Sequence, residues 1–198
     1  MAANTKKQSF SDGLFFRNPI FAAGMSLAPA IIIGNTFRGA VTYSVIFASV
    51  TMMSLMISSF LPRKLPYALR IILYTFIAAA VYIPFCIFFE NRPDYDLSSL
   101  GVLLPMIVSG EFITQASELR FFRMDKGRMI LDIISHIIGF CWALIFLGFV
   151  RELFATGGID GELYGISFTI PVLSAPCGGF ILIGLMGAFI RLFKKEDR

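Results

Sequence analysis

The sequence predicts an all-α integral membrane protein whose six transmembrane helices form two inverted three-helix repeats. The first observation is composition: 57% of the 198 residues are hydrophobic and only 15% are charged, with a mean hydropathy of +0.77. Such a chain is too apolar for a water-soluble domain. A series of long apolar runs and an uneven distribution of lysine and arginine complete the prediction. We expect a cytoplasmic N-terminal segment at 1–17, a single membrane domain at 18–193 and a cytoplasmic tail at 194–198.

Six apolar runs approach the length of about 20 residues that a helix needs to cross a bilayer. They cover approximately 19–34, 40–61, 67–89, 98–117, 129–150 and 166–193. The first and fourth runs differ from the others because they contain Pro29 and Pro105. Proline removes a backbone donor and clashes with the preceding helical turn. We therefore expect spans 1 and 4 to be partial or broken helices.

The positions of lysine and arginine predict the orientation in the membrane, because cytoplasmic loops carry an excess of both residues. If the N-terminus is cytoplasmic, fourteen of the 17 basic residues face the cytoplasm. The three that then face outward are Arg38, Arg92 and Arg151. This asymmetry predicts a multi-pass protein of the cell inner (plasma) membrane with both termini in the cytoplasm.

Six spans with both termini on one side divide into three plus three, so the second set is inverted relative to the first. The two interrupted spans then take the first place in each half. Paired segments interrupted by Gly or Pro indicate a central site at the interface of inverted repeats. The two halves are only weakly similar in sequence, so the predicted symmetry depends on hydropathy and on the two prolines.

Four ionisable residues near or within the apolar runs are candidates for an ion or proton path: Glu111, Glu118, Asp132 and His136. An ionisable group inside a bilayer costs at least about 2.5–3.5 kcal/mol on insertion scales. Glu111 is either a working residue or the end of a helix that has reached water. Glu118 either pairs with an arginine of the 120–128 loop or has a functional role.

Asp132 and His136 lie one helical turn apart on a common helix face. A carboxylate one turn from an imidazole can share a proton with it. The pair is therefore either a proton relay or an interfacial pair whose heads reach the lipid headgroups.

Two further features have structural interpretations. Arg151 and Glu152 close the fifth apolar run, where they predict an interfacial charge pair ahead of a glycine-rich turn in ATGGIDGELYG. The glycines from Gly178 to Gly187 place small residues on one face of the last helix, which favours close helix packing over ligand binding.

Other chemistry is excluded by spacing. Cys86, Cys141 and Cys177 are isolated in apolar stretches without a CxxC pattern, so we interpret them as small buried hydrophobic residues. The basic residues flank membrane spans and form no stripe typical of a nucleic-acid-binding protein. The chain contains no nucleotide-binding loop and no serine hydrolase set, so we predict no catalytic, metal-binding or cofactor-binding residue. The partner that composition does predict is membrane lipid.

Several stretches in order along the chain match a known family. They are NP at 18–19, LAP at 27–29, LPYALRI at 65–71, LGVLLPMIV at 100–108, GFVRELFATGGIDG at 148–161 and APCGGFILIGLMGA at 175–188. With them, about residues 18–190 resemble the paired six-helix membrane subunits of the Rnf ferredoxin:NAD oxidoreductase and the sodium-pumping Nqr NADH:quinone oxidoreductase, most closely the RnfE/NqrD branch. The resemblance implies an inverted-repeat fold in which half-helices of spans 1 and 4 meet near the midplane.

The resemblance also implies an iron–sulfur cluster, held by one cysteine from each partial span of two related subunits. In this sequence Ala28 and Glu111 occupy the matching positions. Glu118 and the Arg151-Glu152 pair agree with the family, whereas Gln115-Ala116 replace its Gly-Arg. An alanine cannot ligate iron, so we expect the family fold without a cluster held by this chain.

Two functions follow as hypotheses. In the first, the chain is a membrane subunit of an Rnf/Nqr-like ion-translocating electron-transport complex, at most a non-catalytic part of an oxidoreductase, that provides scaffold and ion path. It then pairs with a related six-helix protein, as a homo- or heterodimer, and with flavin or iron–sulfur subunits. In the alternative, it is a transporter-like protein that reuses the inverted repeat and binds a cation, a proton or a small solute at Glu111.

Overall fold

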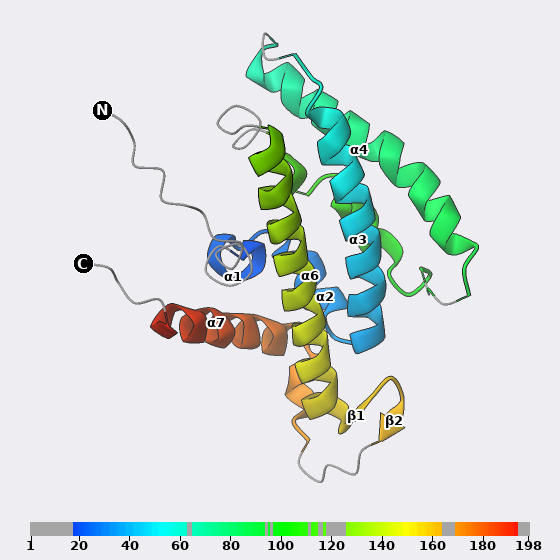
Figure 1. The fold of residues 1–198 in the computed structure, drawn as a ribbon. Coiled ribbons are helices and arrows are strands. Elements are labelled where there is room, and N and C mark those ends of the chain that lie inside the picture. The colour runs from blue at the N-terminus through cyan, green and yellow to red at the C-terminus, as the bar shows by residue number, and fades with distance from the viewer. Residues whose placement is uncertain are drawn as a thin grey trace.

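The computed structural model describes residues 18–62, 65–93, 95, 97–110, 112–114, 117, 126–163 and 169–193. Within this part the chain is helical apart from loops and a small hairpin (Figure 1). The predicted all-α class is therefore confirmed in its main feature. The arrangement as six spans in two inverted repeats stays a prediction.

Three helices are long and apolar enough to cross a membrane within the part of the chain that is described. They are α3 (Phe37–Ser58), α4 (Tyr67–Glu90) and α6 (Lys126–Thr156), and they correspond to predicted spans 2, 3 and 5. Helix α3 packs against both of the others, with α4 and α6 alongside it (Figure 1). At 1.5 Å per residue, even α3 extends for about 33 Å, which matches the hydrocarbon thickness of a bilayer.

The first predicted span is broken into α1 (Pro19–Ala23) and α2 (Leu27–Ile33). The break is at Gly24, which ends α1 with φ +66°, and at Ser26, which precedes α2 with φ +54°. Pro29 is not its cause. Pro29 lies in the first turn of α2, where the missing N–H would have had no helical partner.

The fourth predicted span is also irregular. It contains η2 (Gly101–Leu103) and η3 (Pro105–Ile107), followed by a turn at Val108 and Ser109, and residues 112–114 are helical. Here the proline does have a local role, because Pro105 opens η3. Both runs are thus irregular among the described residues, as expected, while their membrane topology stays a prediction.

The sixth predicted run, 166–193, contains η4 (Pro171–Ser174) and α7 (Pro176–Phe193). Helix α7 begins at Pro176, so it is shorter than the apolar run from which it was predicted. It crosses α6 at a steep angle, and the end of α6 leads into the hairpin of β1 (Gly158–Ile159) and β2 (Glu162–Leu163) (Figure 1). Asp160 and Gly161 turn this hairpin with φ of +53° and +84°, as an Asp-Gly turn between paired strands favours.

The core lies between α3 and α6 and includes a cluster of buried aromatic rings. The ring of Phe47 stacks on Phe140 at a centroid distance of 4.1 Å and meets the edge of Phe112 at 5.4 Å. Phe47 is near the middle of α3 and Phe140 is near the middle of α6. The fourth span therefore reaches the midpoint of the helix bundle directly after its irregular turn.

Candidate functional site

Asn18 holds the start of the first interrupted span against the middle of α6. Its side chain is fully buried. The Oδ1 atom accepts a hydrogen bond from the backbone N–H of Ile20 at 2.9 Å and so caps α1. The Nδ2 atom donates to the carbonyl oxygen of Gly139 at 2.7 Å. In the sequence, Asn18-Pro19 stands out only as part of the family resemblance, which gives the asparagine no role.

The two interrupted spans meet at one level of α6. The first contacts Gly139 through Asn18, and the fourth contacts Phe140 through Phe112, at a ring centroid distance of 6.4 Å. Gly139 and Phe140 are neighbours in sequence. This convergence at the middle of the bundle is the arrangement that paired interrupted spans predict for a central site.

Ala28 is the second residue of α2 and its side chain is exposed. Its methyl group offers no atom that could coordinate a metal. The described cysteines lie on three other helices, Cys86 on α4, Cys141 on α6 and Cys177 on α7. In the described part of the chain, no three His, Cys, Asp or Glu side chains come together as metal ligands. Ala28 therefore cannot supply the ligand that the resemblance implies at this position.

The interpretation of the cysteines as buried residues is correct for only part of the set. Cys141 is half-buried, and its Sγ donates to the carbonyl oxygen of Ser44 at 3.4 Å. Cys86 is also half-buried, but Cys177 is exposed near the start of α7. None of the three forms a disulfide.

Glu111 and Glu118 lie outside the described residues. The described residues next to them in sequence, Phe112 and Ser117, are buried. The roles of the two glutamates stay predictions.

The structure brings Asp132 and His136 together on α6, one turn apart. The imidazole Nδ1 lies 2.8 Å from the main-chain oxygen of Asp132 and 3.6 Å from its Oδ1. The two side chains are mostly shielded, with exposures of 11% for His136 and 16% for Asp132. The bond to the backbone fixes the orientation of the ring and places the N–H on Nδ1. Proton relay and interfacial pair both stay open as interpretations.

Arg151 is not the interfacial residue that the sequence predicts, because only 1% of its surface is exposed. Its Nε donates to the carbonyl oxygen of Leu173 at 2.9 Å, and its Nη1 donates to that of Ile31. Its Nη2 lies 3.2 Å from the carbonyl oxygens of both Ser174 and Ala175. One guanidinium therefore joins α2 to the end of η4 and to Ala175, which precedes α7.

The sequence could not reveal this role, because the four acceptors are backbone atoms 22 to 120 residues away. The carbonyls at a helix C-terminus lack helical donors and carry a partial negative charge. A buried guanidinium, with five N–H groups in a fixed plane, satisfies several of them at once.

Glu152 also has a structural role different from the predicted charge pair. Its Oε2 accepts from the backbone N–H of Phe37 at 2.6 Å, at the start of α3. Its Oε1 accepts from the N–H of Asp160 at 2.8 Å, in the turn of the hairpin. The carboxylate thus satisfies a free donor at a helix N-terminus and ties the hairpin to the end of α6.

Small residues allow these contacts to form. A Cβ on Gly179 would lie 3.1 Å from Nη1 of Arg151 and 3.0 Å from Cγ2 of Ile31. A Cβ on Gly148 would lie 2.8 Å from the Cβ of Ala40. The expected close packing of α7 is therefore confirmed at Gly179, whereas Gly184 faces open space.

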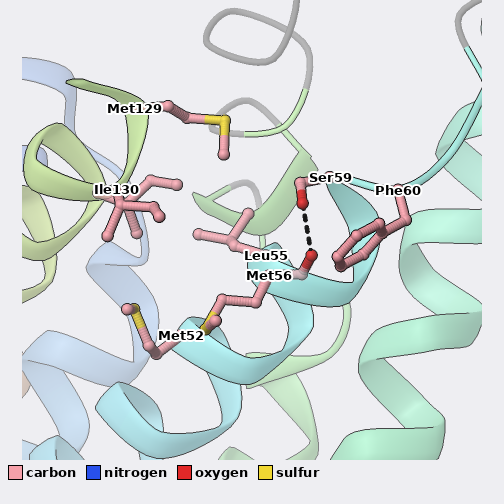
Figure 2. Close-up of a pocket in the computed structure, with 8 residues that line it drawn as sticks. Met52, Leu55, Met56, Ser59, Phe60, Met129 and Ile130 are labelled. Carbon is pink, nitrogen blue, oxygen red and sulfur yellow. Dashed lines mark hydrogen bonds between the residues drawn. The ribbon is translucent and has the colours of Figure 1, made fainter. Parts of the chain in front are cut away.

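A cavity between the Ser58 end of α3 and the start of α6 is apolar (Figure 2). Its lining consists of Met52, Leu55, Met56, Ser59, Phe60, Met129, Ile130 and Ile133. The Oγ of Ser59 is already bonded to the carbonyl oxygen of Met56 at 2.6 Å, as the dashed line shows. Because the other side chains of this lining are apolar, the cavity does not suit ion or proton chemistry.

Comparison with known proteins agrees with the motifs. The family model described as "Rnf-Nqr subunit, membrane protein" matches residues 6–190. A component of the proton-translocating ferredoxin:NAD(+) oxidoreductase complex of Clostridium ljungdahlii is 26% identical, over 94% of this chain and 89% of its own length. A component of the ion-translocating oxidoreductase complex of Pasteurella multocida is 23% identical, over 97% of this chain and 92% of its own.

A component of the Na(+)-translocating NADH-quinone reductase of Pseudomonas aeruginosa is 28% identical, over the full length of this chain and 92% of its own. Relatives from the ferredoxin-linked and the quinone-linked complexes thus both align along nearly the whole chain. The order of the motifs, the broken first and fourth spans and the family match agree. The chain belongs to the Rnf-Nqr subunit family of membrane proteins.

Proposed function

We propose that this chain is an integral membrane subunit of an ion-translocating electron-transport complex of the Rnf/Nqr type, in which it provides scaffold and ion path. The observation that carries the proposal is the convergence of the two interrupted spans on Gly139 and Phe140, in a chain whose family match covers 6–190. The relatives are named as subunits of proton-translocating, ion-translocating and Na(+)-translocating complexes.

The proposal includes the absence of a cluster held by this chain. Ala28 supports it, because the methyl side chain stands at the position where the resemblance implies a thiolate. The described cysteines support it as well, since they lie on three separate helices. Electrons then pass through other subunits of the complex, and this chain contributes no redox centre.

The proposed topology is six spans in two inverted repeats, with both termini in the cytoplasm. Glu111, Glu118, Asp132 and His136 are the proposed ion or proton path. The proposed partners are a related six-helix membrane protein and subunits that carry flavin or iron–sulfur groups.

Affinity purification of the full chain, expressed with its neighbouring genes, tests the assembly. We expect a flavin- or iron–sulfur-bearing protein to co-isolate, with an absorption spectrum that comes from that partner. Iron analysis of the chain purified alone should give no stoichiometric iron. Isolation of the chain without any redox partner would contradict the proposed assembly, and stoichiometric iron in the chain alone would contradict the lack of a cluster.

The transporter-like alternative makes a different prediction for the same chain. In proteoliposomes that contain this protein alone, it predicts cation or proton flux that falls in E111Q. The proposed function predicts no flux without the partner subunits, so this assay separates the two.

A further inference from the structure

Helix α3 carries buried hydroxyl groups that have no hydrogen-bond partner among the described residues. They belong to Ser44, Thr51, Ser54 and Ser58, whose exposures are 3%, 0%, 0% and 1%. The Oγ atom of each lacks a partner within the described structure. A buried polar group without a hydrogen bond destabilises a protein, so a set of four on one helix needs an explanation.

A partner is within reach for any hydroxyl on a helix, because Ser and Thr can donate to the carbonyl of the preceding turn. Other residues of this chain do so. Ser49 donates to Val45 at 2.8 Å, Thr75 to Ile71 at 2.7 Å and Ser117 to Ile113 at 2.8 Å. The four buried hydroxyls of α3 therefore lack the backbone bond that Ser49, Thr75 and Ser117 make.

Three of these hydroxyls form a row that starts beside the aromatic cluster. One helix face contains, at positions i, i+4, i+7 and i+11, Phe47, Thr51, Ser54 and Ser58. The ring of Phe47 contacts Phe112 and Phe140. At Phe47, this face of α3 is thus packed against both α6 and residues 112–114 of the fourth apolar run.

The row runs from the middle of α3 to its C-terminal end. From Phe47 to Ser58 the helix rises about 16 Å, which is close to half of the hydrocarbon thickness. Its inner end lies next to Phe112, the residue that follows Glu111 in sequence. The row therefore extends from the aromatic cluster, where Phe47 contacts Phe112, to the Ser58 end of α3.

Helix packing alone does not explain the row. Small residues let helices approach closely, and alanine or glycine serves that purpose without a polar atom. A serine in a helix interface also normally donates its hydroxyl to a carbonyl oxygen of its own helix, as Ser117 does. A partner outside the protein accounts for hydroxyl groups that are buried and yet have no bond within the described structure.

We propose that Thr51, Ser54 and Ser58, the hydroxyl row, bind a chain of water molecules that forms a hydrated path from the break in the fourth span to the Ser58 end of α3. Water both donates and accepts, so it completes the bonding of each hydroxyl. The use of this path by a proton or a small cation rests on the proposed function. The hydration of the row does not depend on the proposed function.

Hydroxyl-radical labelling of the full chain in lipid nanodiscs tests the proposal, because radiolysis creates the radicals from water itself. Single cysteines are introduced as S54C and S58C after Cys86, Cys141 and Cys177 have been replaced by alanine. The matched controls are V50C and L55C, at positions equally buried on α3. We expect oxidation at 54 and 58 to be at least about tenfold faster than at 50 and 55. Equal rates at all four positions would overturn the proposal.

A second measurement covers the case in which the cysteine variants do not fold. The T51V substitution removes a hydroxyl while it preserves the shape of the side chain. If Thr51 is hydrated, T51V loses bonds to water and its Tm falls by a few degrees. An unchanged or higher Tm would show a dry hydroxyl and would overturn the proposal. Neither measurement involves partner subunits, so failure here is distinct from failure of the co-isolation test.

Discussion

Buried polar groups are hydrogen-bonded at one end of the helix bundle and lack partners among the described residues at the other. Near the end of α6, the charged side chain of Arg151 is buried and bonded to four backbone carbonyl oxygens. In the other half of the bundle, three hydroxyls on α3 are equally buried and have no partner among the described residues. A fully bonded group fixes the positions of the elements around it. A row of unbonded groups can accept a ligand.

The energetics support this distinction. Burial of a charge is strongly unfavourable unless hydrogen bonds compensate for it, so the contacts of Arg151 are needed for the α2, η4 and α7 segments to pack together. An unpaired hydroxyl costs less and is compensated by a single water. Substitution of Arg151 is therefore expected to reduce stability strongly, whereas substitutions in the hydroxyl row are expected to reduce stability less and to change hydration.

The largest effect is expected for R151M. Loss of the guanidinium removes the donor from the buried carbonyl of Ile31 and from the partly buried carbonyls of Leu173, Ser174 and Ala175. The free energy of unfolding should therefore fall by at least about 3 kcal/mol. Unfolding by SDS or by heat in detergent measures it. R191M, at an exposed position in the last turn of α7, is the control and should behave as wild type. Equal stability of R151M and R191M would remove the structural role of Arg151.

G179V should have the next largest effect. The position that its Cβ would take lies only 3.0–3.2 Å from atoms of Ile31 and Arg151, so overpacking should cost about 1–3 kcal/mol. The same substitution at Gly184, which faces open space, is the matched control on the same helix. The Tm of each variant in detergent checks this. If G179V and G184V have the same Tm, the close contact between α7 and Arg151 is not important for stability.

The smallest of these effects is expected for E152Q. The amide retains an acceptor oxygen for one of the two backbone donors, Phe37 or Asp160, and loses the bond to the other together with the negative charge at the start of α3. The expected loss in the free energy of unfolding, measured by the same detergent unfolding, is about 1 kcal/mol. E162Q, at an exposed position in the hairpin, is the control and should leave the free energy of unfolding unchanged. A gain in stability for E152Q would contradict the capping role.

Much of the fold could be predicted from the sequence, because hydropathy and the positions of Pro and Gly are local signals. The three long helices and the two interrupted spans follow from apolar length, Pro and Gly. The cause of the first break could not be predicted correctly, since Pro29 is compatible with the first turn of α2 and the positive φ at Ser26 depends on its surroundings. Close packing at Gly179 was predictable from the small residues of α7.

The candidate site was less predictable, because its contacts are distant in sequence. Two adjacent charges at a helix end gave no sign that Arg151 would bind carbonyls of Ile31 and Leu173. Asn18 reaches Gly139 across 121 residues. The hydroxyl row had a readable signal in its spacing, but serine and threonine on an apolar helix normally bond to their own backbone, so spacing alone did not single them out.

Ion transport by the assembled complex tests the central claim most directly, namely that this chain provides the ion path of an electron-transport complex. The complex carrying T51V/S54A/S58A and the complex carrying R191M are each reconstituted into vesicles, and transport driven by electron transfer is compared with that of wild type. We predict at least about a tenfold loss of transport in the triple variant, with assembly intact, and normal transport in R191M. Unchanged transport by a fully assembled triple variant would contradict the account.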